Sequence, residues 1–535
     1  MDFQKLSPVG LVEHLILYAN IHLCLPFEDN LYYYNMICGL LGIEPEGGHL
    51  FSGRASCACP ACGDGSPEQL KSPVPIVKSL LAAAPAAHRL DIPEKSLACL
   101  LIGLLMPAPS KTVEYFNTIL SDGGDVRDAL NWFYDLCIAS DYIPLAEVSE
   151  NIKWRTETPK GPIDITINVS KPEKNNADIA KALKRNAGGG YPKCAICLEN
   201  VGYFGGGAIP PRQTLRTLPL ILNDEEWHFQ YSPYNYFNEH CIVFSKEHRP
   251  MKTDVGTFNR LLDFVEKFPH YFLGSNADLP IVGGSIMTHD HYQGGNYAMP
   301  MFGAKPRMEF IDASRNVRVS VPDWGATVLR LESRSRFDLF TAADGITRGW
   351  AKYSNPRLNI VNGPKERHNA VTTIARQNEK GEYVLELILR NNHTTEARPD
   401  GFFHVNPKYF NIKKEGIGLI EAMGVFILPG RLARQARELT PYLTGAARFD
   451  AETFKTEKSD FAVHADMVEE LLKEGPVKND AEAGARIEGY IDEVCENILT
   501  DIGVFKEDAT GNTALIEFIT NLGFEVFDER KFRRY

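Results

Sequence analysis

The sequence lacks an excess of positive charge. Lys and Arg together number 57 against 69 for Asp and Glu, which gives a net charge of -12 and a pI near 5.7. Nucleic acids and anionic membranes attract proteins through clustered cationic charge. We therefore expect neither as a partner, and a local cationic pocket would have to meet any anionic substrate.

Long hydrophobic runs are also absent. The longest apolar run, residues 97–106, is shorter than the roughly 18 residues that a membrane helix needs. Residues 1–5 show no signal-peptide pattern. These two absences predict a cytoplasmic protein without a membrane partner.

Cysteine is too sparse for a disulfide-built protein. The eleven cysteines are an odd number spread over 535 residues, which argues against a disulfide scaffold. Two pairs, Cys59 with Cys62 and Cys194 with Cys197, have a spacing that can hold a tetrahedral metal ion. Reduced core thiols are the alternative for both pairs. No second ligand pair follows Cys62 at standard spacing, so metal binding there, with or without Cys57, stays open.

The sequence does not alternate strands with helices as a parallel α/β protein does. With 44% hydrophobic residues, a chain of this length forms two or three domains. Apolar residues at helical spacing mark residues 1–155 and 431–535, whereas residues 156–310 and 311–430 have the texture of strands. We expect an α+β fold of antiparallel sheets and flanking helices, with mostly helical N-terminal and C-terminal regions. The two sheet-rich segments are consistent with a duplicated unit, although no sequence repeat proves it.

One dense motif carries most of the recognisable chemistry. Residues 283–295 read Gly-Gly-Ser-Ile-Met-Thr-His-Asp-His-Tyr-Gln-Gly-Gly. Successive side chains of a strand point to opposite faces, so we expect His289, His291 and Gln293 on one face. Two imidazoles and a carboxamide beside glycine amides suit attack on a phosphate. They also suit metal binding, and packed histidines in a strand are a third alternative.

A closed metal site is the main competitor for these histidines. Cys194 and Cys197, with His248 and His289 further along the chain, could supply a Cys₂His₂ set. Such a set would be structural and would leave His291 available for chemistry. Barrel hydrolases also carry His-x-His on an early strand, but many strand–helix units follow it there, and this chain does not show them.

Six stretches of the sequence match one known family in residues and order. They are residues 191–197 (Tyr-Pro-Lys-Cys-Ala-Ile-Cys), 223–227, 238–243, 276–280, 283–295 and 413–424. Together they closely resemble class II galactose-1-phosphate uridylyltransferases, which belong to the histidine-triad superfamily. The resemblance covers nearly the whole chain. It implies that residues 156–310 form a catalytic histidine-triad-like half and residues 311–430 a second such half.

The resemblance implies a nucleotidyl transfer in galactose metabolism. UMP would move from UDP-glucose to galactose 1-phosphate by a ping-pong mechanism, yielding glucose 1-phosphate and UDP-galactose. Carried over by position, His291 is the nucleophile that becomes uridylylated, and Gln293 holds the phosphoryl oxygens of that intermediate.

The resemblance also implies one inorganic cofactor. Cys194, Cys197, His248 and His289 match the positions that bind a structural zinc ion in the class I branch. No organic cofactor is implied, and the superfamily implies a homodimer.

Further positions are expected to contact substrate. Asn223 and Asp224 resemble residues that contact the uridine ribose, and Asn276 resembles an asparagine on the phosphate side. Backbone amides are expected to approach phosphate at three positions, which are Gly283, Gly284 and Ser285. Side-chain chemistry adds three cations suited to diphosphate and sugar phosphate, which are Arg212, Arg216 and Lys413. A solvated surface charge is the alternative for each cation.

Two positions depart from the better-known class I pattern. Asp290 stands where class I enzymes have proline, as expected for class II. His404-Val405-Asn406 stands where the family commonly has His-x-His, so we predict no second metal site.

Two alternative functions remain at this stage. A dinucleotide hydrolase or phosphorylase of the same superfamily would use water or phosphate in place of the sugar phosphate. A nucleotide-binding protein without turnover is the other alternative. The presence of His291 and Gln293 argues against it, because binding alone does not need a nucleophile.

Overall fold

The structure is a computed structural model that describes residues 3–46, 72–84, 92–169, 190–206, 209–284, 286–363, 366–457, 461–475 and 477–527. The chain divides into two compact units. The first comprises Met1–Val148, Lys174–Asn235 and Glu239–His248, and the second comprises Ser149–Glu173, Tyr236–Asn238 and Arg249–Tyr535. The four regions predicted from the sequence divide the chain differently, and their boundaries stay predictions. The predictions for Cys57, Cys59, Cys62 and Ser285 concern positions outside the described residues.

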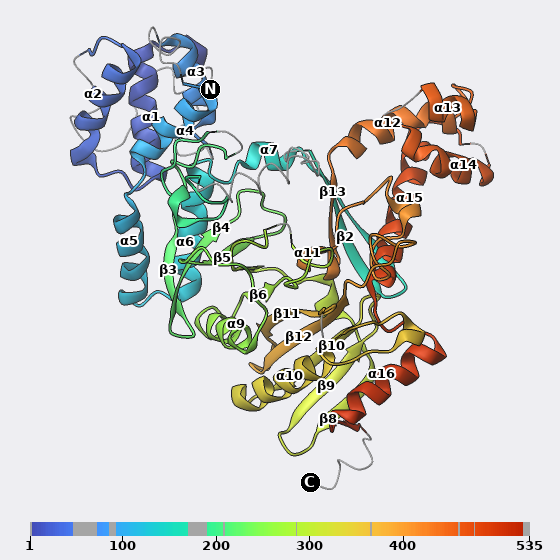
Figure 1. The fold of residues 1–535 in the computed structure, drawn as a ribbon. Coiled ribbons are helices and arrows are strands. Elements are labelled where there is room, and N and C mark those ends of the chain that lie inside the picture. Colours follow the sequence, from blue (N-terminus) through green and yellow to red (C-terminus); the bar gives the residue numbers. More distant parts are fainter. Residues whose placement is uncertain are drawn as a thin grey trace. The chain divides into compact units, whose positions relative to one another are not determined.

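The first unit combines helices with three antiparallel strands (Figure 1). Its helices are η1 (Phe3–Lys5), α1 (Pro8–His22), η2 (Phe27–Asp29), α2 (Asn30–Leu41), α3 (Val74–Ala83), α4 (Glu94–Leu105), α5 (Pro109–Ser121), α6 (Val126–Ala139) and η6 (Leu198–Asn200). Its strands are β3 (Leu218–Leu222), β4 (Glu225–Tyr231) and β5 (Cys241–Ser245), each antiparallel to the next. A short helix, α7 (Leu145–Ser149), ends at the first residue of the second unit.

Local sequence signals explain how these elements begin, turn and pack. Asp125 caps α6, because its carboxylate accepts hydrogen bonds from two backbone N–H groups of the first turn. Asn223 and Asp224 have φ values of 50° and 59°, so they form the two-residue turn that joins β3 to β4. The helix packs on this hairpin, where the Phe133 and Tyr231 ring centroids lie 5.5 Å apart.

The second unit contains a three-stranded sheet and a longer run of antiparallel strands. The three-stranded sheet has the order β1–β2–β13, in which β13 is parallel to β2. The longer run has the order β14–β8–β9–β10–β12–β11–β6–β7. These strands are β1 (Ile152–Thr158), β2 (Gly161–Asn168), β6 (Phe272–Ser275), β7 (His291–Gly295), β8 (Pro306–Asp312), β9 (Val317–Pro322), β10 (Val328–Ser333), β11 (Asn369–Gln377), β12 (Tyr383–Asn391), β13 (Val425–Pro429) and β14 (Glu525–Val526).

Helices cover one face of the longer run of strands. α9 (Val255–Lys267) packs on β6 and β11, and α10 (Arg336–Trp350) packs on β9, β10 and β12 (Figure 1). The two helices also contact each other, so they lie on the same face. The remaining helices of this unit are η7 (Pro300–Gly303), η8 (Pro356–Leu358), η9 (Pro407–Tyr409), α11 (Leu419–Ala422), α12 (Arg431–Leu443), α13 (Ala451–Glu457), η10 (Ala462–His464), α14 (Ala465–Lys473), α15 (Asp480–Ile502) and α16 (Ala509–Asn521).

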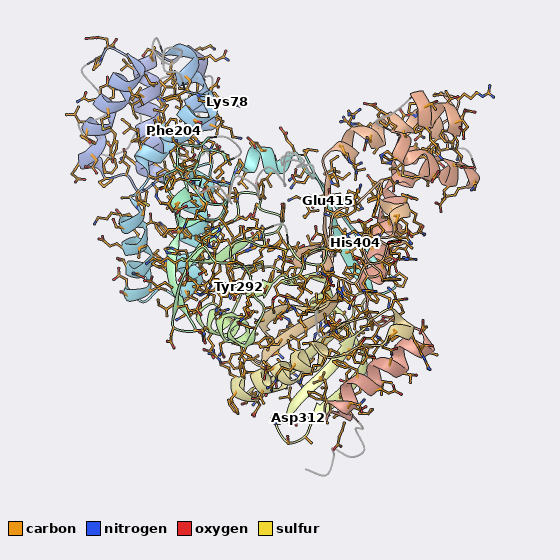
Figure 2. The ribbon with its side chains drawn as sticks, in the orientation of Figure 1. Lys78, Phe204, Tyr292, Asp312, His404 and Glu415 are labelled. Carbon is orange, nitrogen blue, oxygen red and sulfur yellow. The ribbon has the colours of Figure 1, made fainter. Side chains whose placement is uncertain are left out.

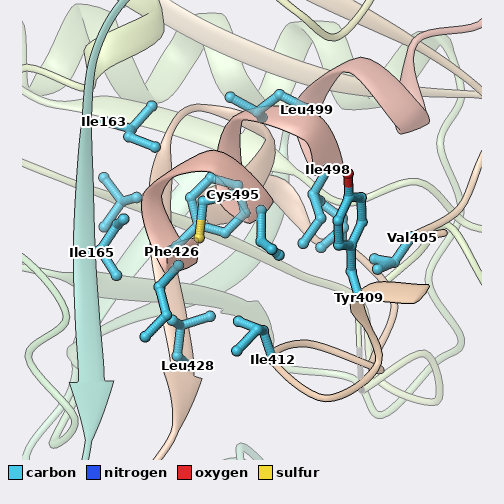
Figure 3. Packing of buried hydrophobic residues seen from close by; sticks show 14 of the residues in the cluster. Ile163, Ile165, Val405, Tyr409, Ile412, Phe426, Leu428, Cys495, Ile498 and Leu499 are labelled. Carbon is cyan, nitrogen blue, oxygen red and sulfur yellow. The ribbon is translucent and has the colours of Figure 1, made fainter. Parts of the chain in front are cut away.

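The main core of the second unit joins its smaller sheet to α15. Figure 3 shows Ile163 and Ile165 of β2 beside Phe426 of β13, together with Cys495 and Ile498 of α15. All five are buried. Removing such side chains from water is the main favourable contribution to folding, so this core holds the helical C-terminal region on the sheets.

The predicted α+β class is confirmed, with mostly antiparallel strands between mostly helical stretches of sequence; the β2–β13 pair is the parallel exception among the strand pairs described. In the parts of the chain that the structure describes, no single helix is long and apolar enough to cross a membrane. Helices α4 and α5 are bent relative to each other, and together they have the length and apolar composition of a membrane-spanning segment.

A buried polar network ties α12 to the segment before α14. His464 Nε2 donates to Gln435 Oε1 at 3.0 Å, and the same oxygen accepts from Arg431 Nη1 at 2.9 Å. His464 Nδ1 accepts from Asn411 Nδ2 at 3.4 Å. Burial, with a smaller effect of Arg431, lowers the pKa of His464 to about 4. The low pKa keeps the imidazole neutral in the folded protein near pH 7. Protonation of Nδ1 would also place its N–H group against the N–H group of the Asn411 amide.

We predict that His464 makes the free energy of unfolding fall as the pH drops from about 6.5 to about 4. The pKa of this group is about 4 when folded and near 6.5 when unfolded, so the unfolded chain binds the extra proton in this window. Between pH 7 and pH 4 the wild type should lose up to about 3 kcal/mol more than His464→Gln, as measured by urea denaturation. An equal pH dependence of the two proteins would contradict this role.

Candidate active site and metal centre

The predicted catalytic motif ends in a strand that lies very close to its neighbour. β7 pairs antiparallel with β6, with Gly274 opposite Gln293 and Leu273 opposite Gly294. A Cβ atom added at Gly294 would lie only 2.1 Å from the Phe272 carbonyl oxygen. Glycine at this position is therefore what allows the two backbones to approach.

His291, the first residue of β7, has a fixed tautomer. Its Nδ1 lies 2.8 Å from the His289 carbonyl oxygen. A carbonyl oxygen can only accept, so Nδ1 carries the proton and Nε2 keeps its lone pair. Burial lowers the pKa of His291 to about 4, and the ring is neutral near pH 7. A neutral imidazole with a fixed lone pair is the form that attacks phosphorus.

Alternation along β7 places Gln293 on the same face as His291. Tyr292, labelled in Figure 2, lies between them in the strand and so belongs to the opposite face. Its hydroxyl accepts a hydrogen bond from Arg260 Nη1 of α9 at 2.8 Å. Asp290 is buried 3.4 Å from Arg249 Nε, and burial raises the pKa of this carboxyl group to about 6. The expectation that His289 lies on the same strand is wrong in detail, because β7 begins two residues later.

The loop before the motif is closed by backbone contacts. Residues Ala277 and Gly283 form a parallel bridge, and a Cβ atom at Gly283 would lie 2.4 Å from the Ala277 carbonyl oxygen. A Cβ atom at Gly284 would lie 2.8 Å from Asn276 Nδ2. Asn276 Oδ1 accepts from Leu419 N at 2.8 Å, at the start of α11. The backbone therefore requires glycine at position 283, whereas a side chain at position 284 would meet only the side chain of Asn276. The oxygen of Asn276 serves the fold.

The predicted pair of cysteine ligands lies in a tight turn. Asn200 organises this turn, since its Nδ2 donates to the carbonyl oxygens of Cys194 and Cys197, each at 2.8 Å. The two Sγ atoms are 3.3 Å apart, far longer than a disulfide bond. Cys197 Sγ also lies 3.1 Å from His248 Nδ1.

These distances fit a tetrahedral metal site. Around an ion with metal–sulfur bonds of about 2.3 Å, two sulfur ligands lie roughly 3.8 Å apart. Cys194, Cys197, His248 and His289 are a group that could hold a metal ion, with one donor atom from each residue. Two sulfur and two nitrogen donors make a Cys/His group that could hold a metal ion, and the role of each residue as a ligand stays a prediction.

Arg216 and Lys413 make contacts inside the protein. Arg216 is buried, and its guanidinium donates to the carbonyl oxygens of Pro107 at 2.7 Å and Gln213 at 2.9 Å. Lys413 Nζ donates to Glu421 Oε1 and to the Ile427 carbonyl oxygen, each at 3.0 Å. These contacts give both side chains a structural role, and their substrate-binding role stays a prediction.

The remaining predicted residues lie in the first unit. The Arg212 guanidinium carbon lies 5.8 Å from the centroid of the Tyr142 ring, and the side chain is partly exposed. Asn223 and Asp224 form the β3–β4 turn, which gives them a structural reason for their residue types. Their predicted contact with ribose stays a prediction.

Sequence reasoning missed two residues that support the site. Asn200 binds both cysteine carbonyls, and the only sequence signal was an asparagine three residues after the Cys-x-x-Cys pair, where turn residues are common. Leu419 supplies a backbone N–H to Asn276 from 143 positions further along the chain. No local pattern reveals a contact over that separation.

The chain is similar to known proteins over most of its length. A family model described as "Galactose-1-phosphate uridyl transferase, N-terminal domain" matches residues 79–250. A galactose-1-phosphate uridylyltransferase of Caldanaerobacter subterraneus subsp. tengcongensis is 41% identical over 473 residues, which cover 86% of this chain and 91% of that protein. A protein of the same name from Clostridium acetobutylicum is 37% identical over a region that covers 92% of this chain and 96% of that protein.

One solved structure aligns weakly. The crystal structure of yeast Ap4A phosphorylase covers 57% of this chain and 89% of its own, with 11% sequence identity and a TM-score of 0.29. This likeness is too low to support an inference.

We predict that Gly294→Ala disrupts the β6–β7 pair. The added methyl group cannot stay 2.1 Å from a carbonyl oxygen, so the strands must separate at a destabilisation of about 3 kcal/mol or more. Thermal unfolding followed by circular dichroism measures the loss. Gly345→Ala in α10 is the matched control, because its Cβ would meet nothing within 4 Å and alanine favours a helix. Equal melting temperatures of the two variants would refute the clash.

Proposed function

The chain belongs to the galactose-1-phosphate uridylyltransferase family, and from this premise we propose that it transfers UMP from UDP-glucose to galactose 1-phosphate through His291. The relatives favour this reaction over the dinucleotide hydrolase or phosphorylase. The observation that carries the proposal is the hydrogen bond from His291 Nδ1 to the His289 carbonyl oxygen, which leaves Nε2 as the nucleophile.

The first half-reaction forms a bond between His291 and phosphorus. Nε2 attacks the α-phosphorus of UDP-glucose, the P–O bond to the sugar phosphate breaks, and glucose 1-phosphate leaves with the bond electrons. The imidazole ring gains positive charge in this step. The His289 carbonyl oxygen stabilises that charge, because the Nδ1–H group still donates to it.

The second half-reaction restores the enzyme. A phosphate oxygen of galactose 1-phosphate attacks the same phosphorus, the P–N bond breaks, and UDP-galactose leaves. The electrons of that bond return to Nε2, so no net proton transfer is needed. Gln293 lies on the same face of β7 and is proposed to donate to a non-bridging oxygen in both steps.

The proposed substrate contacts are the positions that the sequence predicts. Asn276 and the amides of Gly283, Gly284 and Ser285 are proposed on the phosphate side, and Asn223 with Asp224 on the ribose side. Among the proposed cations, the contacts in the described residues favour Arg212. Arg216 and Lys413 already bind carbonyl or carboxylate groups.

We also propose that the metal is zinc and that its role is structural. Cys194, Cys197, His248 and His289 would hold it with four protein ligands, which leaves no open position for substrate. Bound there, zinc would fix the direction of His289. That residue's backbone carbonyl fixes the tautomer of His291, so the metal would act on the chemistry through position alone.

Two further parts of the proposal concern the protein's state. The resemblance to the superfamily supports a homodimer. The proposed substrates are highly charged sugar phosphates that do not cross membranes unaided, which supports action in the cytoplasm where such metabolites are made.

We predict that the wild type becomes labelled by UDP-glucose carrying a labelled uracil ring and releases glucose 1-phosphate. In His291→Ala the labelling of the protein and the release of glucose 1-phosphate should each fall at least about a thousandfold, because no other group forms the P–N bond. His464→Gln, a buried histidine with no proposed role in the reaction, should keep both at pH 7. Free UMP without labelled protein would refute the transferase mechanism and favour the hydrolase.

A second prediction concerns the metal. The purified wild type should contain about one equivalent of zinc more than Cys197→Ser, because Cys197 lies between Cys194 and His248 in the ligand group. Cys99→Ser should keep the wild-type content, since Cys99 contacts only Thr214 Oγ1, at 3.7 Å, among the described contacts. Elemental analysis of the three proteins is the measurement. Equal metal content in all of them would refute the site.

A further inference from the structure

The loop between β6 and β7 contains a residue in an unfavourable backbone conformation. Ile281 has a φ of 74°. A β-branched side chain is rarely found in this region, because its Cβ substituents crowd the following carbonyl group. Among the described non-glycine residues with positive φ, most are asparagine or aspartate, and Ile281 is the β-branched one.

The position of Ile281 connects it to the chemistry. Gly274 pairs with Gln293 of β7, and the loop that contains Ile281 begins directly after β6, at Asn276. The bridge between Ala277 and Gly283 closes the loop around Ile281. The backbone conformation of Ile281 therefore determines the direction in which the chain reaches Gly283. The amide of Gly283 is one of those proposed to bind phosphate.

The Ile281 side chain is partly buried and packs against a small cluster formed by Ala277, Val282 and Ala370. A Cβ atom added at Gly416 would lie 2.5 Å from the Ile281 carbonyl oxygen. Asn392 Nδ2 donates to the Pro280 carbonyl oxygen at 3.2 Å. Only glycine at position 416 leaves room for this approach.

Two more anchors hold the same loop at its start. Leu419 N donates to Asn276 Oδ1 at 2.8 Å. The Asp278 side chain is only 5% exposed and pairs with Arg367 Nη2 at 2.8 Å. A strained backbone persists only where surrounding contacts determine it, and such residues gather at ligand clamps and active sites. Contacts from several segments of the chain hold the backbone conformation of the loop around Ile281.

We propose that Ile281 is a positioning residue of the uridylyl transfer. Its left-handed backbone turns the chain into Gly283, and its packed side chain prevents the loop from leaving that conformation. A glycine at position 281 would adopt the same φ without strain, but it would let the loop sample others. The inference rests on the proposed function and names no contact between Ile281 and substrate.

Single-turnover labelling of the protein by UDP-glucose tests the role. At saturating substrate, Ile281→Gly should form the labelled intermediate about 30-fold or more slowly, because amides displaced by about an ångström stabilise the transition state poorly. The substrate concentration for half-maximal rate should change by less than about threefold. Ile281→Val keeps the branched Cβ and should recover most of the rate, to within about threefold of the wild type.

Thermal unfolding separates positioning from simple packing. If Ile281 only filled space, Ile281→Gly would lower the melting temperature and leave the labelling rate of the folded protein unchanged. That unchanged rate would overturn the proposal, whatever the melting temperature. A wild type that is never labelled would instead refute the proposed function, so the two failures are distinguishable.

A double variant supplies an independent measurement. Asn392→Ala removes the hydrogen bond to Pro280 and should slow labelling in the wild-type background. It should slow labelling much less in the Ile281→Gly background, where no strain remains for the anchor to support. Equal slowing in both backgrounds would show that the two residues act separately and would contradict the proposal.

Discussion

The hydrogen bond from His291 Nδ1 to the His289 carbonyl oxygen is the contact on which the rest of the site depends. In the proposed reaction it leaves Nε2 of His291 as the attacking nitrogen, and it would stay in place when that ring gains charge. The residue that accepts it also offers its own imidazole to the Cys/His group. In the proposed reaction His289 would therefore serve the chemistry through its backbone and the proposed zinc ion through its side chain. A change at that zinc site would then reach His291 without touching substrate.

The surrounding strands and loops act to keep that hydrogen bond in one geometry. β7 can approach β6 because Gly294 has no side chain, and the loop before it can close because Gly283 has none. Glycine alone would leave these segments free to move. Ile281 and the anchors at Asn276 and Asp278 restrict them again. Close approach and rigidity are thus provided by different residues along one short stretch of chain.

Features that depend on neighbouring positions could be predicted from the sequence. Strand alternation placed His291 and Gln293 on one face, and Cys-x-x-Cys spacing identified a turn that could supply two metal ligands. Features set by distant pairing could not be predicted. The carbonyl that binds Arg216 belongs to Pro107, and the oxygen that binds Lys413 belongs to Glu421 at the far end of its motif. The positive φ of Ile281 is likewise invisible, because isoleucine normally favours the opposite region of backbone space.

These differences affect what a motif match means. The stretches that identify the family, residues 276–280 and 413–424, contact each other through Asn276 and Leu419. Lys413 and Glu421 pair within the second stretch. A matched motif therefore marks a unit in space, in which some residues meet substrate and others hold those residues in position. The family resemblance specifies the reaction, but the role of each residue follows only from the contacts that it makes in the fold.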